Sequence, residues 1–165
     1  MGAGKTTIGR ALASNRNWEF SDSDAQVEAR AGRTVADIWA AEGEKGFRTL
    51  ESTALREALA AEEPAVIAAA GGTVLDPSNR ALLRRHQPVV WLRADPTTLA
   101  QRLGDGTGRP LLADEPAAAL KALAAEREPL YAEVADVTID VDFLGPQKVV
   151  ELIEVALRDD GEDDS

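Results

Sequence analysis

The first residues of the sequence constrain its fold more than any other feature. Met1-Gly2-Ala3-Gly4-Lys5-Thr6-Thr7 matches the latter part of the phosphate-binding pattern G-x-x-x-x-G-K-[ST]. That pattern belongs to one local architecture, in which a buried β-strand leads into a glycine-rich turn and the turn opens an α-helix. Apolar side chains at helical spacing between Thr7 and Ser14 supply the helix. We therefore expect an α/β fold with a phosphate site at the amino end of its first helix.

The rest of the sequence alternates short apolar runs with helical stretches, which is the order of a parallel sheet covered by helices. Strands are predicted at 18–20, 66–70, 89–92 and 137–141. Helices are predicted at 24–31, 34–39, 44–61, 77–85, 96–103, 116–131 and 146–157. We expect Ser23 to cap the second helix and Gly32 to end it. No internal repeat or linker interrupts this order, so we expect one domain over residues 1–158.

The phosphate-binding pattern also calls for a fifth strand, which the pattern places before residue 1. A parallel strand covered on both faces is rich in Val, Ile and Leu. Burying about six such side chains at about 1.5–3 kcal/mol each contributes roughly 9–18 kcal/mol, whereas a whole domain is stable by about 5–15 kcal/mol. Residues 1–165 alone are therefore expected to fold poorly or to carry an apolar slot in mid-sheet.

Charge and composition limit the partners of this chain. Asp and Glu number 29 against 18 Lys and Arg, giving a formal net charge of −11 and no basic excess for nucleic acid. Five of the negative charges lie in residues 159–165, which predicts a disordered acidic tail. The sequence has no cysteine and no apolar run of about 18 residues. We expect a cytoplasmic monomer that binds small molecules, with neither nucleic acid nor membrane as partner.

The phosphate loop carries the most explicit chemistry. Backbone N–H groups at the start of a helix bind phosphate oxygens, and Lys5 is placed to reach the β- and γ-phosphates. The Thr6 hydroxyl is a candidate ligand of Mg²⁺. Gly-Lys-Thr alone occurs often by chance, but here it opens an amphipathic helix in an α/β sequence.

Asp22 and Asp24 follow the first predicted strand. Two carboxylates at that place project over the carboxyl edge of the sheet, where ligands bind in open α/β folds. One carboxylate can hold Mg²⁺ through water, and the other can accept a proton from a hydroxyl nucleophile. The alternative is that both side chains only cap the next helix.

Three arginines and a glycine pair complete the candidate site. Arg48 lies near the start of a long helix, Arg109 lies in the glycine-rich break at 104–116, and Arg127 precedes Glu128-Pro129-Leu130-Tyr131. A guanidinium group binds a carboxylate or a phosphate through two oxygens at once, although any single arginine can also be a solvated surface residue. Gly71-Gly72 after a buried strand allows a ligand close to the backbone, or simply forms a tight turn. His86 is expected to be a loop residue without a catalytic part.

Six motifs occur in a specific order, and together they resemble the shikimate kinase family from residue 1 to about 157. They are Gly-Ala-Gly-Lys-Thr-Thr-Ile-Gly-Arg, Ser-Asp-Ser-Asp, Gly43-Glu44-x-x-Phe47-Arg48-x-x-Glu51, Gly71-Gly72-Thr73-Val74, Thr107-Gly108-Arg109-Pro110-Leu111-Leu112 and Arg127-x-Pro129-Leu130-Tyr131. The resemblance implies a three-layer P-loop kinase fold, with a five-stranded parallel sheet between helices and a mobile lid at about 104–116. It also implies ATP and Mg²⁺ as cofactors, and phosphorylation of the 3-hydroxyl of shikimate in aromatic amino-acid biosynthesis.

The resemblance also implies a role for each matched residue. ATP would be bound by Gly2, Ala3, Gly4, Lys5, Thr6, Thr7, Arg102 and Arg109, with Thr6 and Asp22 serving Mg²⁺. Shikimate would be bound by Asp24, Arg48, Gly71, Gly72 and Arg127, with Glu51 orienting Arg48. Asp24 would be the base, while Lys5 and Arg109 would neutralise charge on the transferring phosphate.

Two alternative functions remain open at the level of sequence. One is another small P-loop kinase acting on a hydroxy-acid such as gluconate, although the pair Arg48 and Arg127 disfavours a neutral acceptor. The other is a non-catalytic nucleotide-binding relative, because the predicted first strand does not lie within residues 1–165.

Overall fold

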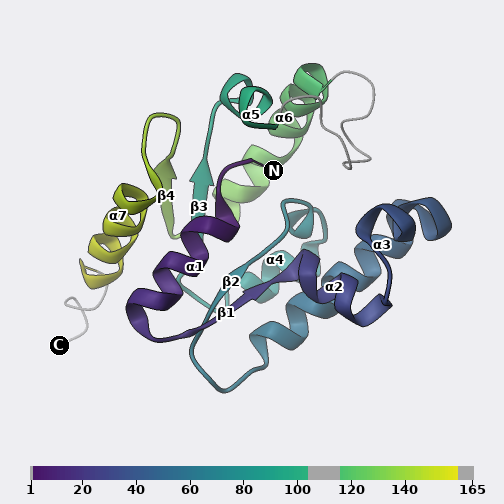
Figure 1. Ribbon diagram of the computed structural model, residues 1–165, viewed down its shortest axis with the longest axis horizontal. Coiled ribbons are helices and arrows are strands. Elements are labelled where there is room, and N and C mark those ends of the chain that lie inside the picture. Colours follow the sequence, from purple (N-terminus) through teal and green to yellow (C-terminus); the bar gives the residue numbers. More distant parts are fainter. Residues whose placement is uncertain (1, 104–115, 160–165) are drawn as a thin grey trace.

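The structure is a computed structural model, and it describes residues 2–103 and 116–159 (Figure 1). Arg109 and nearly all of the predicted lid lie outside these residues, apart from Pro116, which begins a helix. The predicted acidic tail also lies outside them, apart from Asp159, which ends a helix. The predictions of a mobile lid and a disordered tail therefore stay predictions.

Strands and helices alternate along the described residues, as the sequence predicts. The strands are β1 (Glu19–Asp22), β2 (Ala65–Ala68), β3 (Val90–Arg93) and β4 (Val137–Asp140). The α-helices are α1 (Lys5–Arg16), α2 (Ser23–Ala31), α3 (Val35–Leu59), α4 (Pro77–Leu83), α5 (Pro96–Leu103), α6 (Pro116–Val134) and α7 (Pro146–Asp159). A short 3₁₀ helix, η1 (Thr73–Leu75), was not expected from the sequence. The two helices predicted at 34–39 and 44–61 are the two parts of α3, which Gly43 interrupts with a non-helical φ of 67°.

The strands form two separate parallel pairs. β1 pairs with β2, placing Phe20 beside Val66, and β3 pairs with β4, placing Trp91 beside Thr138. In Figure 1, α7 lies beside β4, α2 and α3 lie on the side of β1, and α1 runs between these two groups. A cavity of about 510 Å³ lies between β2 and β3 and is lined mainly by apolar side chains. The mid-sheet slot that the sequence predicts is therefore present.

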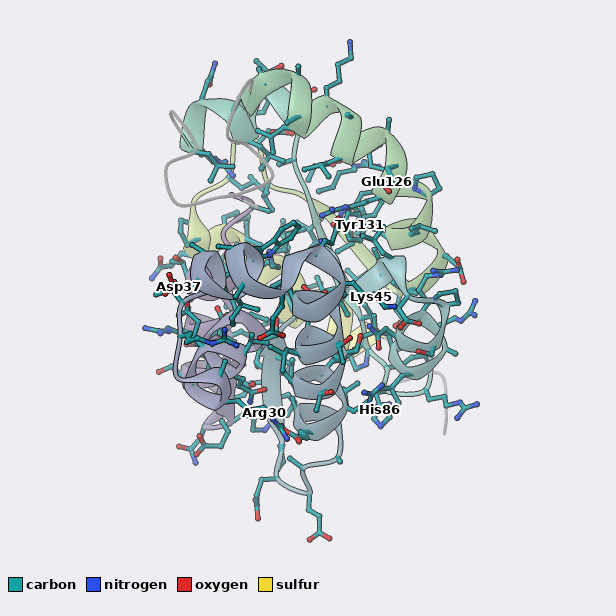
Figure 2. All side chains as sticks on the ribbon, turned by 90° about the vertical axis from the view of Figure 1, so that its right-hand side faces the viewer. Arg30, Asp37, Lys45, His86, Glu126 and Tyr131 are labelled. Carbon is teal, nitrogen blue, oxygen red and sulfur yellow. The ribbon has the colours of Figure 1, made fainter. Side chains whose placement is uncertain are left out.

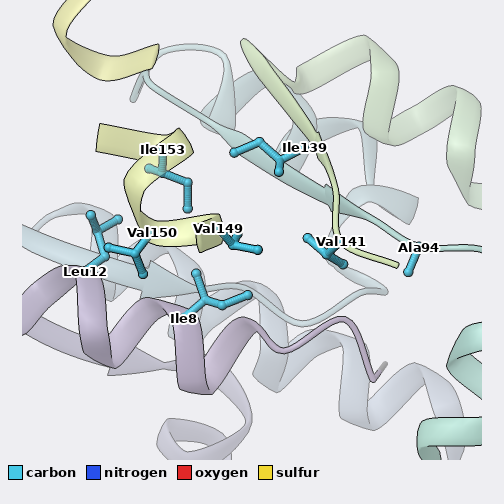
Figure 3. Close-up of a cluster of buried hydrophobic side chains, with 8 residues drawn as sticks. All are labelled: Ile8, Leu12, Ala94, Ile139, Val141, Val149, Val150 and Ile153. Atoms are coloured by element: carbon cyan, nitrogen blue, oxygen red, sulfur yellow. The ribbon is translucent and has the colours of Figure 1, made fainter. Parts of the chain in front are cut away.

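The largest buried cluster fixes α1, and with it the phosphate loop, against the β3–β4 pair (Figure 3). Ile8 and Leu12 lie one helical turn apart on α1 and pack against Val149, Val150 and Ile153 of α7. The cluster is completed by Ala94, Ile139 and Val141. Because these side chains are buried, the amino end of α1 is held at a defined position above the sheet.

Two smaller clusters position the helices that carry the remaining site residues. Val27, Ile38, Phe47 and Ala54 pack α2 against both parts of α3. The other cluster consists of Leu55, Val74, Leu83 and Val134, and it joins α3, η1, α4 and α6. The two clusters together place α2, α3 and α6 around the carboxyl end of β2. No helix within residues 2–103 and 116–159 is long and apolar enough to cross a membrane.

Candidate active site

The loop before α1 is shaped for an anion. Gly2 and Gly4 have φ values of 73° and 90°, a region in which glycine carries no steric penalty. Gly4 is the N-cap of α1 and makes no side-chain capping hydrogen bond. The first turn contains no acidic residue either. The amino end of α1 therefore presents its positive dipole end without a negative charge of its own, which suits a phosphate.

The two predicted metal ligands are in direct contact. The Thr6 hydroxyl donates a hydrogen bond to Asp22 Oδ2 at 2.8 Å, which joins the start of α1 to the end of β1. A hydroxyl and a carboxylate are the hard oxygen donors that Mg²⁺ prefers, and protein sites often supply only one or two while phosphates and water supply the rest. No group of three or more acidic or histidine side chains suited to a metal occurs among the described residues. The donor set therefore fits Mg²⁺ bound together with a nucleotide.

The predicted cap of α2 is wrong. Asp22, not Ser23, caps the helix, because Asp22 Oδ1 accepts the N–H groups of Asp24 and Ala25 at 3.1 and 3.4 Å. Ser23 is only 2% exposed, and its hydroxyl accepts the N–H of Ala70 at 2.8 Å. Asp22 therefore uses one oxygen for the helix and presents the other to Thr6. Through this hydrogen bond, Ser23 connects the segment that carries Asp22 and Asp24 to Ala70, the residue that precedes Gly71-Gly72.

Asp24 has the electrostatic surroundings of a base. Part of the residue is open to solvent, but protein around the carboxyl group desolvates it and raises its pKa above 3.8. The negative charge of Asp22 raises the pKa further, and the positive charge of Lys5 opposes this. A raised pKa gives the carboxylate a greater affinity for a proton. Asp24 and Lys5 are thus close enough to influence each other at the same end of the site.

Arg48 is held by two glutamates of its own helix. Its Nη1 donates to both carboxylate oxygens of Glu51 at 3.0 Å, and its Nε and Nη2 donate to Glu44 at 3.3 and 3.1 Å. Glu51 is 1% exposed, and burial raises its pKa while Arg48 opposes the rise. The predicted orientation of Arg48 by Glu51 is therefore confirmed.

The glycine pair lies directly on the Arg48 guanidinium. A Cβ atom built on Gly72 would lie 1.9 Å from Nη1 and 2.2 Å from Cζ of Arg48. A side chain at residue 72 would force the Arg48 guanidinium to move, so this glycine is required for the close approach of Arg48 and not for a positive φ. The carbonyl of Gly71 accepts a hydrogen bond from the Tyr131 hydroxyl at 2.6 Å, which fixes the other side of the pair.

Arg127 is buried on α6 without a full set of partners. It is 6% exposed, and its Nε atom is buried with no hydrogen-bond partner. Glu126 is 3.8 Å from that Nε, beyond hydrogen-bond distance. Burial raises the pKa of Tyr131, and the positive charge of Arg127 lowers it. A buried guanidinium nitrogen without a partner points to an anionic ligand, because such groups are otherwise satisfied within the protein.

The described site residues converge on one end of the sheet. The Coulomb interactions of Glu51 with Asp24 and Arg127 connect the second and third motifs with the last, and the interaction of Asp24 with Lys5 connects them to the first. Arg102 donates to the carbonyls of Gly2, Val141 and Asp142 at 3.5, 2.8 and 3.1 Å, so it joins α5 to the phosphate loop. Arg109 lies outside the described residues. His86 is exposed and lies well away from Tyr131 and Glu126 of α6 (Figure 2).

Three supporting residues were not predicted from the sequence. Ser23 has the composition of a helix cap, and Tyr131 belongs to a quoted motif, but no local pattern reveals their partners on the 70–71 loop. Asn79 is buried and donates to Ser52 Oγ at 2.9 Å and to the carbonyl of Thr73 at 3.1 Å. Because Asn79 is one polar residue in a helical stretch, the sequence contains no signal for this contact.

Comparisons with known proteins agree with the site. The family model described as shikimate kinase matches residues 1–158. A shikimate kinase from Symbiobacterium thermophilum is 50% identical over 98% of this chain and 94% of its own length. Another from Thermobifida fusca is 45% identical over 92% of this chain and 87% of its own length. The solved structure of shikimate kinase from Acinetobacter baumannii in complex with shikimate superposes with a TM-score of 0.93 at 37% identity, covering 97% of this chain and 89% of that one.

Proposed function

Because this chain belongs to the shikimate kinase family, we propose how its residues divide the work of transferring phosphate from ATP to shikimate. The acceptor is the 3-hydroxyl of shikimate, and the products are shikimate 3-phosphate and ADP. Phosphoryl transfer through a loose transition state needs positioning and charge neutralisation more than covalent help. The described residues offer positioning and charge neutralisation at three places: the phosphate loop, the acidic pair Asp22 and Asp24, and the arginine pair Arg48 and Arg127.

The phosphate loop and α1 bind the triphosphate of ATP. Gly2, Ala3, Gly4 and Thr7 contribute backbone N–H groups, and Lys5 contributes its charge to the β- and γ-phosphates. This role is supported by the uncapped first turn of α1 and by the positive φ values of the two glycines. Arg102, which contacts the carbonyl of Gly2, packs near the adenine.

Thr6 and Asp22 hold Mg²⁺ when the nucleotide is bound. Their hydrogen bond at 2.8 Å supports this assignment, because it brings the two oxygens within the distance at which both can ligate one small cation. Held by these two residues, Mg²⁺ would supply charge neutralisation at the phosphates of the nucleotide. Asp22 keeps its other oxygen on the amino end of α2, so the ligand is anchored by the helix that it caps.

Asp24 receives the proton of the acceptor hydroxyl. Its carboxyl group stands one residue beyond the anchored Ser23, and its raised pKa favours proton uptake. Lys5, whose charge reaches Asp24, connects the acceptor side of the site with the phosphate side. We propose that Arg109 joins Lys5 in neutralising the transferring phosphate, closing with the lid at 104–116 so that water does not compete as acceptor.

Arg48 and Arg127 clamp the carboxylate of shikimate. The observation that carries this proposal is the Arg127 Nε atom, which is buried without a hydrogen-bond partner. Glu51 and Glu44 accept hydrogen bonds from most of the donor groups of Arg48 and so fix its orientation. Arg127 has fewer partners within the protein than Arg48, so more of its hydrogen-bonding capacity is left for an anionic ligand. Gly71 and Gly72 allow the ring to approach the backbone beside Arg48.

A coupled assay of ADP release tests this function. With Mg²⁺ and ATP, we expect rapid ADP release with shikimate and only background release with gluconate, a flexible hydroxy-acid without the ring. Equal rates with both acids would contradict specificity for shikimate, and no acceptor-dependent release would contradict the function. We also propose that the enzyme acts as a cytoplasmic monomer, and sedimentation at micromolar concentration should give a single species of about 17.5 kDa.

A further inference from the structure

The Tyr131 hydroxyl connects two of the groups that the proposed function assigns to shikimate. It donates a hydrogen bond to the carbonyl of Gly71 at 2.6 Å. Arg127 lies one helical turn before Tyr131 on α6, so the two side chains are neighbours on one face of the helix. The positive charge of Arg127 lowers the pKa of Tyr131, so it acts on the same hydroxyl. One phenol group therefore joins the glycine pair to the arginine proposed to bind the substrate carboxylate.

The ring of Tyr131 is held by apolar contacts that do not involve its hydroxyl. Its centroid lies 5.5 Å from that of Trp91, with 39° between the two ring planes. Tyr131 also packs against the buried cluster that joins α3, η1, α4 and α6. Burial raises the pKa of Tyr131, so the phenol keeps its proton at neutral pH. That proton is donated to Gly71, and the phenol oxygen can still accept a hydrogen bond from a guanidinium group.

The bond to Tyr131 sets the orientation of one peptide unit in the 70–72 turn. The carbonyls of Ala70 and Gly72 accept backbone N–H groups at 3.1 and 3.0 Å, whereas the carbonyl of Gly71 accepts the Tyr131 hydroxyl. Because a peptide unit is planar and trans, the N–H of Gly72 points away from the carbonyl of Gly71 and from Tyr131. Gly72 is buried, yet its N–H makes no hydrogen bond to another residue that the structure describes. A buried N–H requires a partner, and a hydroxyl of the ligand is a suitable acceptor.

We infer that Tyr131 is a positioning residue for shikimate, an inference that rests on the proposed function. Its hydroxyl holds the peptide between Gly71 and Gly72 at a fixed place relative to Arg127, so that the N–H of Gly72 binds a hydroxyl of the ring. The carboxylate at Arg127 and this ring hydroxyl are then bound at one fixed spacing, which orients the ring. Without the Tyr131 hydroxyl the peptide can turn and its N–H is lost to the substrate, while Arg127 still binds the carboxylate.

The hydroxyl can be removed while the ring stays in place. Tyr131→Phe keeps the aromatic contact with Trp91 and loses the hydrogen bond to Gly71. Thr53→Val is the matched control, because it removes an exposed hydroxyl that donates to the carbonyl of Thr49 at 2.9 Å. For the parent protein and both variants, the KM for shikimate, the KM for ATP, the melting temperature and the inhibition constant of cyclohexene carboxylate are measured. This inhibitor has a ring and a carboxylate but no hydroxyl group.

We expect Tyr131→Phe to raise the KM for shikimate about three- to tenfold, which is the effect of one lost hydrogen bond. The KM for ATP and the inhibition constant should stay at the parent values, because neither ligand uses the N–H of Gly72. Thr53→Val should match the parent protein throughout. An unchanged KM for shikimate would overturn the inference, and so would an equal rise in both KM values and the inhibition constant together with a lowered melting temperature, since the hydroxyl would then only support the fold. A parent protein without shikimate-dependent ADP release would instead refute the proposed function, and this inference with it.

Discussion

Replacing Arg127 by Met should separate substrate recognition from stability. Methionine keeps an unbranched side chain of similar length, but it lacks the positive charge and the guanidinium group that can bind two carboxylate oxygens at once. Arg127 is 6% exposed, its Nε atom has no hydrogen-bond partner, and Glu126 approaches only to 3.8 Å. The variant therefore removes a buried cation whose main proposed partner is the substrate.

The size of the effect follows from the bonds that the substrate loses. A hydrogen bond to a charged group contributes about 1.5–3 kcal/mol, and each 1.4 kcal/mol corresponds to about tenfold in an equilibrium constant. The KM for shikimate should therefore rise roughly 10- to 150-fold. The KM for ATP should change less than about threefold, because Arg127 does not contact the phosphate loop. Because the Nε atom of Arg127 has no hydrogen-bond partner and methionine fills a similar space, the melting temperature should not fall.

Initial-rate kinetics and thermal unfolding of the two proteins check these values, with Arg30→Met, an exposed arginine paired with Glu57 on α3, as the matched control. Loss of Arg127 should also raise the pKa of Tyr131 further, since its positive charge lowers that pKa in the parent protein. A rise of the same size in both KM values would refute the assignment of Arg127 to the carboxylate. A lowered melting temperature would refute the view that its charge is incompletely paired.

Three further substitutions test other parts of the site. Asp24→Asn should abolish shikimate-dependent ADP release. Because the pKa of Asp24 is higher in the folded protein than in the unfolded chain, the protein loses stability as the pH rises from 3.8 through the folded pKa. The Asn variant should lack that decline in melting temperature when the melting scans are repeated across this pH range. Gly72→Ala should displace the Arg48 guanidinium and raise the KM for shikimate at least tenfold. The control Gly145→Ala, whose added methyl group would meet no atom within 4 Å, should leave the KM unchanged. Equal KM values in the two variants would show that the close approach of Gly72 to Arg48 is not needed. Ser23→Ala leaves the partly buried backbone N–H of Ala70 without its acceptor and should lower the free energy of unfolding by about 1–3 kcal/mol. It should also raise the KM for shikimate, and Ser23→Thr should restore both values. Urea unfolding that matches the parent protein would contradict this role.

Local sequence signals predicted the elements well, because the helices have clear starts and ends. Pro96 and Pro116 begin helices, Gly32 ends one in the left-handed conformation, and Gly43 breaks α3 where two helices were expected. The positions of the strands were also predicted to within a few residues, since each is a short apolar run between helices. Their division into two pairs with an apolar cavity between them agrees with the slot that the phosphate-binding pattern led us to expect.

The contacts that position the site were less predictable than the residues that form it. Ser23 has the right residue type for a cap, but Asp22 lies one residue earlier and its carboxylate reaches the same N–H groups, so the shorter hydroxyl bonds to Ala70 instead. The bond of Tyr131 to Gly71 spans 60 residues, and pairings at that distance leave no periodic signal in one sequence. Net charge alone was also a poor guide, because a chain of net charge −11 still places Arg48 and Arg127 close enough to act on the same carboxylate, Glu51.

The central claim is that the chain holds the shikimate carboxylate between Arg48 and Arg127 and its 3-hydroxyl at Asp24. A crystal structure with shikimate and a non-hydrolysable ATP analogue measures this directly. We predict carboxylate oxygens at about 2.7–2.9 Å from both guanidinium groups, and the 3-hydroxyl within hydrogen-bond reach of the Asp24 carboxylate, facing the γ-phosphate. A ring bound with its carboxylate away from Arg127, or with a different hydroxyl at Asp24, would contradict the account.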